Sequence, residues 1–199
     1  MTYNRDSKAN FSYTACALPT RIRNHFPAIR LVSMVTVGNI GQAVAPRDLC
    51  RYLPNYVYEP DQFPAVFYRV KNPCITFTIF ASGKVIAHGG RKLADVRDHF
   101  RKLLSFLEPL GIRATTATIP KISMLVGSGA VATRLDLERL AERLPNVEYR
   151  TNGFPALSSH FDRCVVALVF RSGRVVITGV RSVGSLHDIF NRILAVAHD

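Results

Sequence analysis

The sequence lacks any apolar stretch near the roughly 18 residues that a membrane-spanning helix needs, so we expect no membrane partner. Residues 1–28 also lack a charged head followed by an apolar run, the pattern of a secretory signal. Cysteine is sparse, and no cysteine has zinc-ligand spacing to another cysteine or to a histidine. Most of the cysteines lie among apolar residues, where a free thiol acts as a small hydrophobe. We therefore predict an intracellular, reducing compartment and no metal. The cysteines are Cys16, Cys50, Cys74 and Cys164.

The chain is also poor in acidic residues, with 14 Asp and Glu against 26 Lys and Arg, a net charge of +12. Such an excess favours a polyanionic partner, nucleic acid first and acidic lipid or protein second. The plainer interpretation is a soluble protein that is basic without a polyanionic ligand.

Signatures of catalysis are missing as well. The Gly-rich segments 38–41 and 127–129 lack the Lys and Ser/Thr of a phosphate-binding loop, so strand-end turns explain them better. No nucleophile–base pair and no paired carboxylates occur at equivalent places, so we expect no enzyme, cofactor or small-molecule substrate. The histidines are scattered: His25, His88, His99, His160, His187 and His198.

What the sequence does contain is an internal repeat. Residues 80–91 and 170–181 share Phe, Ser, Gly, Val, Gly and Arg at identical positions, at an offset of 90. Phe-Pro-Ala recurs at 63–65 and 154–156, at an offset of 91, and residues 32–35 match 126–129 loosely. Because the order of these segments is the same in both halves, a duplication explains them better than chance.

Each half shows the same predicted elements. A β-rich run (31–37; 122–126) precedes a short helix, with Pro46 in its first turn in one half and leucines 135, 137, 140 and 144 in the other. Strands then flank a Ser-Gly turn, at Ser82-Gly83 and Ser172-Gly173. A long amphipathic helix closes each half, and residues 112–119 read as a strand that joins the halves. We predict a basic, poorly ordered tail (1–28), a first repeat (29–119) and a second repeat (120–199).

The central strands are apolar on both faces. In residues 164–170, Val165, Ala167 and Val169 alternate with Val166, Leu168 and Phe170, and residues 75–80 behave similarly. The helices of each half can cover only one face, so the other needs a partner. One possibility is further protein, such as a dimer mate. The other, favoured by the charge, is a polyanion with a shallow apolar surface, which describes the DNA minor groove.

Three runs carry a resemblance to a known family: 58–64 (Tyr-Glu-Pro-Asp-Gln-Phe-Pro), 63–69 (Phe-Pro-Ala-Val-Phe-Tyr-Arg) and 79–85 (Ile-Phe-Ala-Ser-Gly-Lys-Val). Over residues 30–197, both repeats resemble the core of the TATA-binding protein (TBP) family. The resemblance implies an α+β fold, in which two pseudo-symmetric repeats form a saddle-shaped antiparallel ten-stranded sheet with four helices on its convex face. It also implies a general transcription initiation factor that binds and bends DNA from the minor groove.

The resemblance assigns DNA contacts residue by residue. The kinking wedges fall on Phe63, Phe80, Phe154 and Phe170. Further groove-facing positions fall on Val32, Thr78, Ile86, His88, Val126, Leu168, Val176 and Thr178. Basic positions near phosphates fall on Arg69, Lys84, Arg91, Arg174 and Arg181.

Departures from the family pattern indicate altered specificity. Two Asn residues at the pseudo-twofold centre of the family align with Arg30 and Met124, while His88 replaces a Thr and Thr78 a Leu. Loss of the amides should relax the preference for TATA sequences, although arginine favours narrow A·T grooves. The alternative function is a TBP-like protein-interaction module that binds transcription factors without productive DNA binding.

Partner docking is expected to differ too. The family carries acidic residues before the second wedge, where a transcription factor IIB-like protein docks, but this chain has Arg150 and Asn152 there. The first-half loop keeps Glu59 and Asp61, so we expect IIB-like and IIA-like partners in a weakened or altered arrangement. In a eukaryotic host the resemblance implies a nuclear protein.

Overall fold

The computed structural model describes residues 28–113, 115–131, 134–149 and 154–198. Two long strands, β1 (Ala28–Asn39) and β6 (Thr118–Ala130), run through both halves of the molecule. The first lobe contains α1 (Pro46–Tyr52), β2 (Tyr56–Val57), β3 (Ala65–Val70), β4 (Ile75–Phe80), β5 (Lys84–Gly89), α2 (Leu93–Leu107) and a 3-10 helix (Glu108–Leu110). The second lobe contains α3 (Leu137–Ala141), β7 (Val147–Glu148), β8 (Ala156–His160), β9 (Val166–Phe170), β10 (Arg174–Val180) and α4 (Val183–His198).

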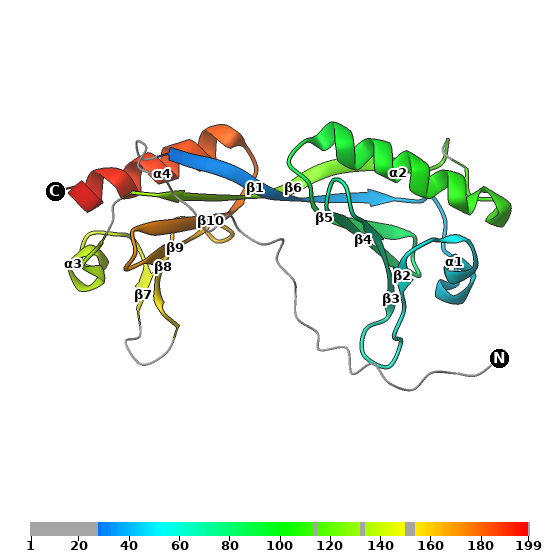
Figure 1. Ribbon diagram of the computed structural model, residues 1–199, viewed down its shortest axis with the longest axis horizontal. Coiled ribbons are helices and arrows are strands. Elements are labelled where there is room, and N and C mark those ends of the chain that lie inside the picture. The colour runs from blue at the N-terminus through cyan, green and yellow to red at the C-terminus, as the bar shows by residue number, and fades with distance from the viewer. Residues whose placement is uncertain (1–27, 114, 132–133, 150–153, 199) are drawn as a thin grey trace.

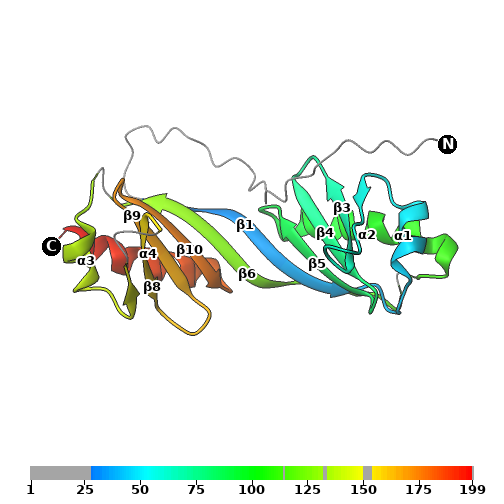
Figure 2. The ribbon, with the colours of Figure 1, turned by 90° about the horizontal axis from the view of Figure 1, so that it is seen from below.

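Within the described residues, ten strands form one open antiparallel sheet accompanied by four α-helices, which confirms the predicted α+β saddle. The strand order is β2-β3-β4-β5-β1-β6-β10-β9-β8-β7, so the two lobes have the same strand order when each is followed outward from the β1–β6 pair. Helices α2 and α4 lie across the convex face, and α1 and α3 lie at the outer ends (Figure 1). Seen from below, the concave face presents bare strands (Figure 2).

The convex side holds the hydrophobic core, as the apolar stripes of the two long helices predict. In each helix the buried side chains recur at three- and four-residue spacing and pack on the sheet. They are Val96, Phe100, Leu103, Leu104 and Leu107 of α2, and Leu186, Ile189, Phe190 and Ile193 of α4. Val183, the first residue of α4, is 49% exposed and lies outside this buried stripe.

The Ser-Gly turns are confirmed in both lobes. Gly83 (φ 82°) and Gly173 (φ 76°) have positive φ, and each amide donates to the carbonyl of the preceding phenylalanine, Phe80 or Phe170, at 2.9 Å. Glycine adopts this left-handed conformation at little steric cost, which explains its recurrence at both turns. The two turns bring the ends of β4 and β5, and of β9 and β10, into register.

Two expectations from the sequence are wrong. Residues 112, 113 and 115–117 form a connection, not a strand, because Thr116 bonds locally: its hydroxyl and amide both donate to the carbonyl of Arg113, at 2.9 and 3.2 Å. The strand begins only at Thr118. Cys74 and Cys164 are exposed, because they lie in the turns before β4 and β9.

Cys50 does behave as a small, partly buried side chain. Its Sγ donates to the carbonyl of Pro46 at 3.3 Å, and burial raises the pKa of the thiol. Cys16 lies outside the described residues. No helix of the described chain is both long and apolar enough to cross a bilayer, and no three His, Cys, Asp or Glu side chains there are grouped to hold a metal ion.

Candidate nucleic-acid interface

The alternation of side chains along the central strands separates a buried face from an accessible one. In β4, Ile75, Phe77 and Ile79 are fully buried against the helices. In β9, Ala167 and Val169 are likewise buried. The opposite side chains, Thr76 and Phe80 in β4 and Val166, Leu168 and Phe170 in β9, stay partly exposed on the concave face.

The four predicted wedges form two matching pairs on this concave face. The ring centroids of Phe63 and Phe80 are 6.0 Å apart at an interplanar angle of 65°. Those of Phe154 and Phe170 are 6.2 Å apart at 62°. Both pairs are edge-to-face, the geometry that aromatic quadrupoles favour. Phe63 is 37% and Phe154 58% exposed, although each is large and apolar. The structure therefore repeats one exposed aromatic unit in both lobes.

Phe67 is a third ring in the first lobe that sequence reasoning missed. Its centroid lies 5.5 Å from that of Phe63, and its strand neighbour across the sheet is Thr78. The second lobe has no such ring, because Ser158 pairs with Leu168 at the corresponding place. The Phe63 wedge therefore rests on two rings and the Phe154 wedge on one.

At the centre of the saddle, the residues of β1 that correspond to those of β6 lie three positions later in the chain than the sequence alignment of the two repeats predicts. Val35 pairs with His88 in the first lobe as Val126 pairs with Thr178 in the second, so the repeats superpose here at an offset of 91. The β1–β6 ladder agrees, since Ser33 pairs with Val126 and Val35 pairs with Met124. The residue equivalent to Met124 is thus Ser33.

Arg30 and Val32, which the sequence placed at or near the centre, lie elsewhere. Arg30 pairs with Ser128 toward the second lobe, and Val32 falls in an irregularity of the ladder between Leu31 and Ser33. A bulge changes which face each following residue occupies, which is why an ungapped match of residues 32–35 to 126–129 misplaced them. The offset of 91 shared by Phe63 and Phe154 was the signal that would have found Ser33 and Val35.

The remaining groove candidates share the concave face with the wedges. Cross-strand partners point to the same side of a sheet, and the ladders link these residues in rows. Thr78 pairs with Ile86, and Leu168 pairs with Val176. Thr178 donates its hydroxyl to the sulfur of Met124 at 4.0 Å. Desolvation by the surrounding protein lowers the pKa of the His88 imidazole below its ordinary value, although much of the side chain is exposed.

The basic candidates fall at two places. Arg69, Lys84 and Arg174 lie on β3, β5 and β10, and Arg174 Nε donates to the hydroxyl of Ser128 at 3.4 Å. Arg91 and Arg181 lie beyond the opposite ends of β5 and β10, just before the long helices, and both are exposed. The cations therefore flank the apolar strip of the concave face.

The expected docking residues are only partly described. Glu59 lies in the β2–β3 loop, where its backbone carbonyl accepts from the amides of Gln62 and Phe63 at 3.0 and 2.9 Å. Its Oε2 atom is buried without a hydrogen-bond partner in the described structure, whereas Asp61 is exposed. Arg150 and Asn152 lie outside the described residues.

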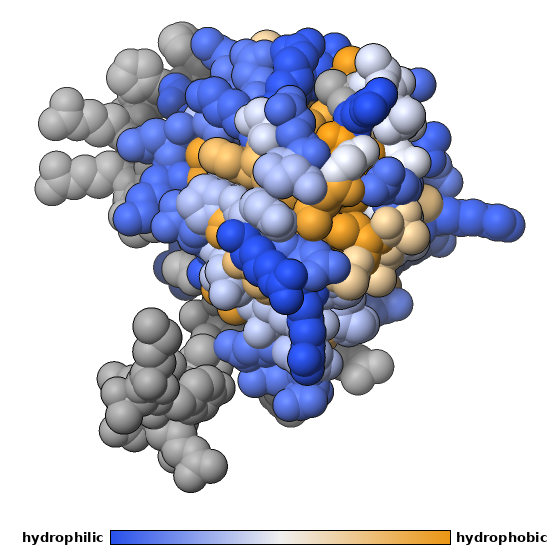
Figure 3. All heavy atoms as spheres, turned by 90° about the vertical axis from the view of Figure 1, so that its right-hand side faces the viewer, coloured by the Kyte–Doolittle hydropathy of each residue, from blue (hydrophilic) through white to orange (hydrophobic). Residues whose placement is uncertain are grey.

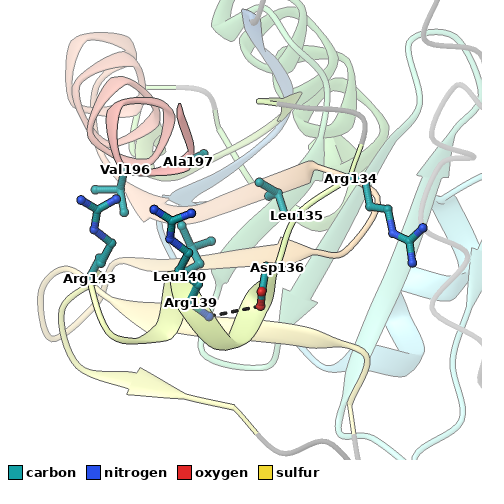
Figure 4. A pocket seen from close by; sticks show the side chains of 8 residues that line it. All are labelled: Arg134, Leu135, Asp136, Arg139, Leu140, Arg143, Val196 and Ala197. Carbon is teal, nitrogen blue, oxygen red and sulfur yellow. Dashed lines mark hydrogen bonds between the residues drawn. The ribbon is translucent and has the colours of Figure 1, made fainter. Parts of the chain in front are cut away.

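Other surface features lie away from the concave face. At the outer end of the first lobe, apolar side chains gather within a hydrophilic surround (Figure 3). In the same lobe Tyr52 of α1, Tyr56 of β2 and Phe106 of α2 are 39%, 45% and 36% exposed. At the outer end of the second lobe, a cavity of about 140 Å³ lies between α3 and the end of α4, where Asp136 accepts from the Arg139 amide (Figure 4).

Comparison with known proteins gives a family model, curated relatives and a solved structure that agree with one another. The family model described as "Transcription factor TFIID (or TATA-binding protein, TBP)" matches residues 28–110 and 119–197. The TATA-box-binding protein of Methanocaldococcus jannaschii is 31% identical over 84% of this chain and 92% of its own length. That of Pyrodictium occultum is 30% identical over 84% of each chain. The solved structure "Methanococcus jannaschii TBP" superposes with a TM-score of 0.75 at 30% identity, covering 86% of this chain and 99% of its own.

Proposed function

The chain belongs to the TATA-binding protein family, whose members are DNA-binding transcription factors and not enzymes, and on this premise we propose that it is a transcription initiation factor that binds and bends duplex DNA through the minor groove. The observation that carries the proposal is the duplicated pair of exposed phenylalanines on the concave face. Apolar wedges of this kind unstack base steps and kink the duplex toward the major groove.

Charge and shape support the same ligand. The net charge of +12 and the flanking cations Arg69, Lys84 and Arg174 suit phosphates on both sides of a groove. The apolar strip between them, which includes Val35 and Val126, suits sugars and base edges that offer few donors.

Sequence preference is proposed to be relaxed. The central positions are Ser33 and Met124, and neither carries an amide that could hydrogen-bond two base acceptors at once. Recognition would then depend mainly on how easily the duplex bends and on groove width.

Partner docking is proposed to be altered as well. A transcription factor IIB-like or IIA-like protein would meet a first-lobe loop in which Asp61 is free to form contacts and Glu59 is half-buried. Charge reversal at Asp61 should weaken such an interaction more than reversal at Glu59. The relatives named above come from archaea, so a nuclear setting is not part of this proposal.

The central test removes the wedges from the full chain. Binding to a TATA-containing duplex, and the bend it induces in permuted fragments, are measured for Phe63→Ala, Phe154→Ala and the double variant. Loss of an aromatic stack costs about 1–3 kcal/mol, so each single variant should bind roughly 5- to 150-fold more weakly and bend less. Phe106→Ala is the matched control, since Phe106 is exposed to a similar extent but lies on the convex helix α2. A double variant that binds and bends like the wild type would exclude the proposal.

A second test addresses specificity. Ser33→Asn with Met124→Asn restores an amide pair at the centre, and should raise the ratio of TATA to G·C-rich affinity by about tenfold, since one well-placed amide contact discriminates by about 1–3 kcal/mol. A strict TATA requirement in the wild type would contradict the relaxed preference while leaving DNA binding intact.

The alternative, a protein-interaction module, has one observation in its favour: the exposed aromatic side chains Tyr52, Tyr56 and Phe106 of the first lobe. The salt dependence of DNA binding separates the two functions. Phosphate contacts give a steep fall in affinity with salt, whereas a module without productive DNA binding would show weak binding and no bend.

A further inference from the structure

The two lobes present different chemistry at equivalent groove positions. The Ser-Gly turns align β4 with β9 and β5 with β10 at an offset of 90. On β4 the concave side chains before the wedge are Thr76 and Thr78, whereas on β9 they are Val166 and Leu168. The first lobe therefore has two hydroxyls where the second has two aliphatic groups.

An imidazole extends this polar set. His88 on β5 is the cross-strand neighbour of Thr76, just as Thr178 on β10 is the neighbour of Val166. The Thr178 hydroxyl donates to the sulfur of Met124. Among the described residues, no side-chain hydrogen bond within the protein uses Thr76, Thr78 or His88, so their acceptor atoms are available to a ligand.

The availability differs within the set. Thr78 is only 4% exposed, while Thr76 is half-buried and His88 is exposed. Thr76 Oγ1 and the unprotonated ring nitrogen of His88 are therefore the acceptors that a groove edge can reach. Desolvation lowers the pKa of His88, which keeps that nitrogen unprotonated at neutral pH.

The minor groove distinguishes base pairs by one donor. A·T and T·A pairs present only acceptors there, and a G·C pair adds the 2-amino group of guanine. An aliphatic side chain laid over that amino group leaves a buried donor without a partner, which is costly. A hydroxyl or an imidazole nitrogen can accept from it.

We infer that the two lobes differ in base tolerance: the first lobe accepts a G·C pair through Thr76 and His88, and the second lobe, through Val166 and Leu168, is confined to A·T. The inference rests on the proposed function. It makes recognition directional, because a site with one G·C-containing half fits in only one orientation.

Palindromic A·T duplexes test this, with G·C placed in neither half, in one half or in both. On a one-half site the full chain can turn to place its first lobe on the G·C pair, so affinity should fall less than about threefold. On the two-half site the second lobe must meet guanine, and affinity should fall about tenfold, or 1.4 kcal/mol. Inosine lacks the 2-amino group, so inosine·C in both halves should bind like A·T.

Swapped variants supply the matched controls. Thr76→Val with His88→Thr gives the first lobe the residues of the second, and the one-half site should then lose about tenfold. Val166→Thr with Leu168→Thr should restore binding to the two-half site. Far-UV circular dichroism shows whether each variant is folded, and each variant's loss on a G·C-containing site is measured relative to its own affinity for the A·T duplex.

Equal losses on the one-half and two-half sites, or equal losses with guanine and inosine, would overturn the inference while leaving DNA binding in place. Failure to bind any A·T duplex would instead overturn the proposed function, and the inference with it.

Discussion

The two lobes share a frame and differ in what they show to a ligand. Both have a glycine of positive φ near the end of β5 or β10: Gly89 (97°) is the last residue of β5 and Gly179 (90°) the last but one of β10. Both also carry an edge-to-face phenylalanine pair. The groove positions between these features have diverged: the first lobe has two hydroxyls and an imidazole (Thr76, Thr78 and His88), where the second has two aliphatic groups and one hydroxyl (Val166, Leu168 and Thr178). The glycines and phenylalanine pairs that recur are those that the curved sheet and the wedges require. The groove positions that differ can set sequence specificity.

The short helices show the same division. Asp136 caps α3, accepting from the amides of Glu138 and Arg139 at 3.1 and 3.2 Å, whereas α1 begins at Pro46 without a side-chain cap. Both solutions start a helix, one by satisfying free amides and the other by a residue that lacks one. The two lobes therefore begin equivalent helices with different residues.

The largest expected effect tests the shared frame. A Cβ at Gly179 would lie 1.7 Å from the carbonyl oxygen of Cys164, and one at Gly89 would lie 2.3 Å from that of Cys74. Both glycines also have positive φ, so Gly179→Ala and Gly89→Ala should each lower the free energy of unfolding by about 3–4 kcal/mol, measured by urea denaturation.

Gly111→Ala is the control for these substitutions. Gly111 has φ 74° but no atom within 4 Å of its added Cβ, so only the left-handed strain of about 1–2 kcal/mol remains. If Gly89→Ala or Gly179→Ala lowered the free energy of unfolding no more than Gly111→Ala does, the two glycines would not play equivalent parts in the two lobes.

A smaller effect tests the unequal support of the wedges. Phe67 packs on Phe63 in the first lobe, and Ser158 occupies the corresponding strand position in the second. An aromatic pair contributes about 0.5–1.5 kcal/mol beyond its buried area, so Phe67→Ser should lower stability by about 2 kcal/mol and weaken DNA binding by less than Phe63→Ala does. Urea denaturation and duplex binding measure the two effects.

The control lies at the equivalent strand position. Ser158→Ala removes no ring and should change stability by less than about 0.5 kcal/mol. If Phe67→Ser changed the free energy of unfolding as little as Ser158→Ala does, the third ring would give no support to the first wedge, and the expected difference between the lobes would be absent.

Much of this frame could be predicted from the sequence, because its signals are local. The Ser-Gly turns at 82–83 and 172–173 and the helical stripes depend on residues within a few positions of one another. The exposed wedges followed from the repeat and from the family resemblance, since an exposed phenylalanine such as Phe154 has no signature of its own.

The centre of the saddle was not predictable in this way. β1 is rich in β-branched residues whose alternation fits more than one register. The irregularity after Leu31 shifts the register without a glycine or proline of β1 at that point to mark it. Ser33 and Val35 therefore took the places expected for Arg30 and Val32. The contact of Phe67 with Phe63 depends on a loop conformation that periodicity does not report.

The smallest effect concerns pH and separates His88 from its counterpart Thr178. Desolvation lowers the pKa of His88 in the folded protein, and the charged groups on the same face, Arg69, Lys84 and Lys121, are all cationic. On acidification the unfolded chain therefore takes up this proton first. The stability that neutral His88 allows is complete above its unfolded pKa of about 6.5 and declines below it.

Replacing His88 with threonine should remove this decline. The urea midpoint of the wild type should fall more than that of His88→Thr between about pH 7.5 and pH 5.5, and the remaining histidines cancel because both proteins contain them. Identical shifts of the urea midpoint in the two proteins would mean that His88 is as well hydrated in the folded protein as in the unfolded chain. The concave face would then have no effect on the protonation of His88. Thr76 alone would remain as a desolvated acceptor that distinguishes the first lobe from the second.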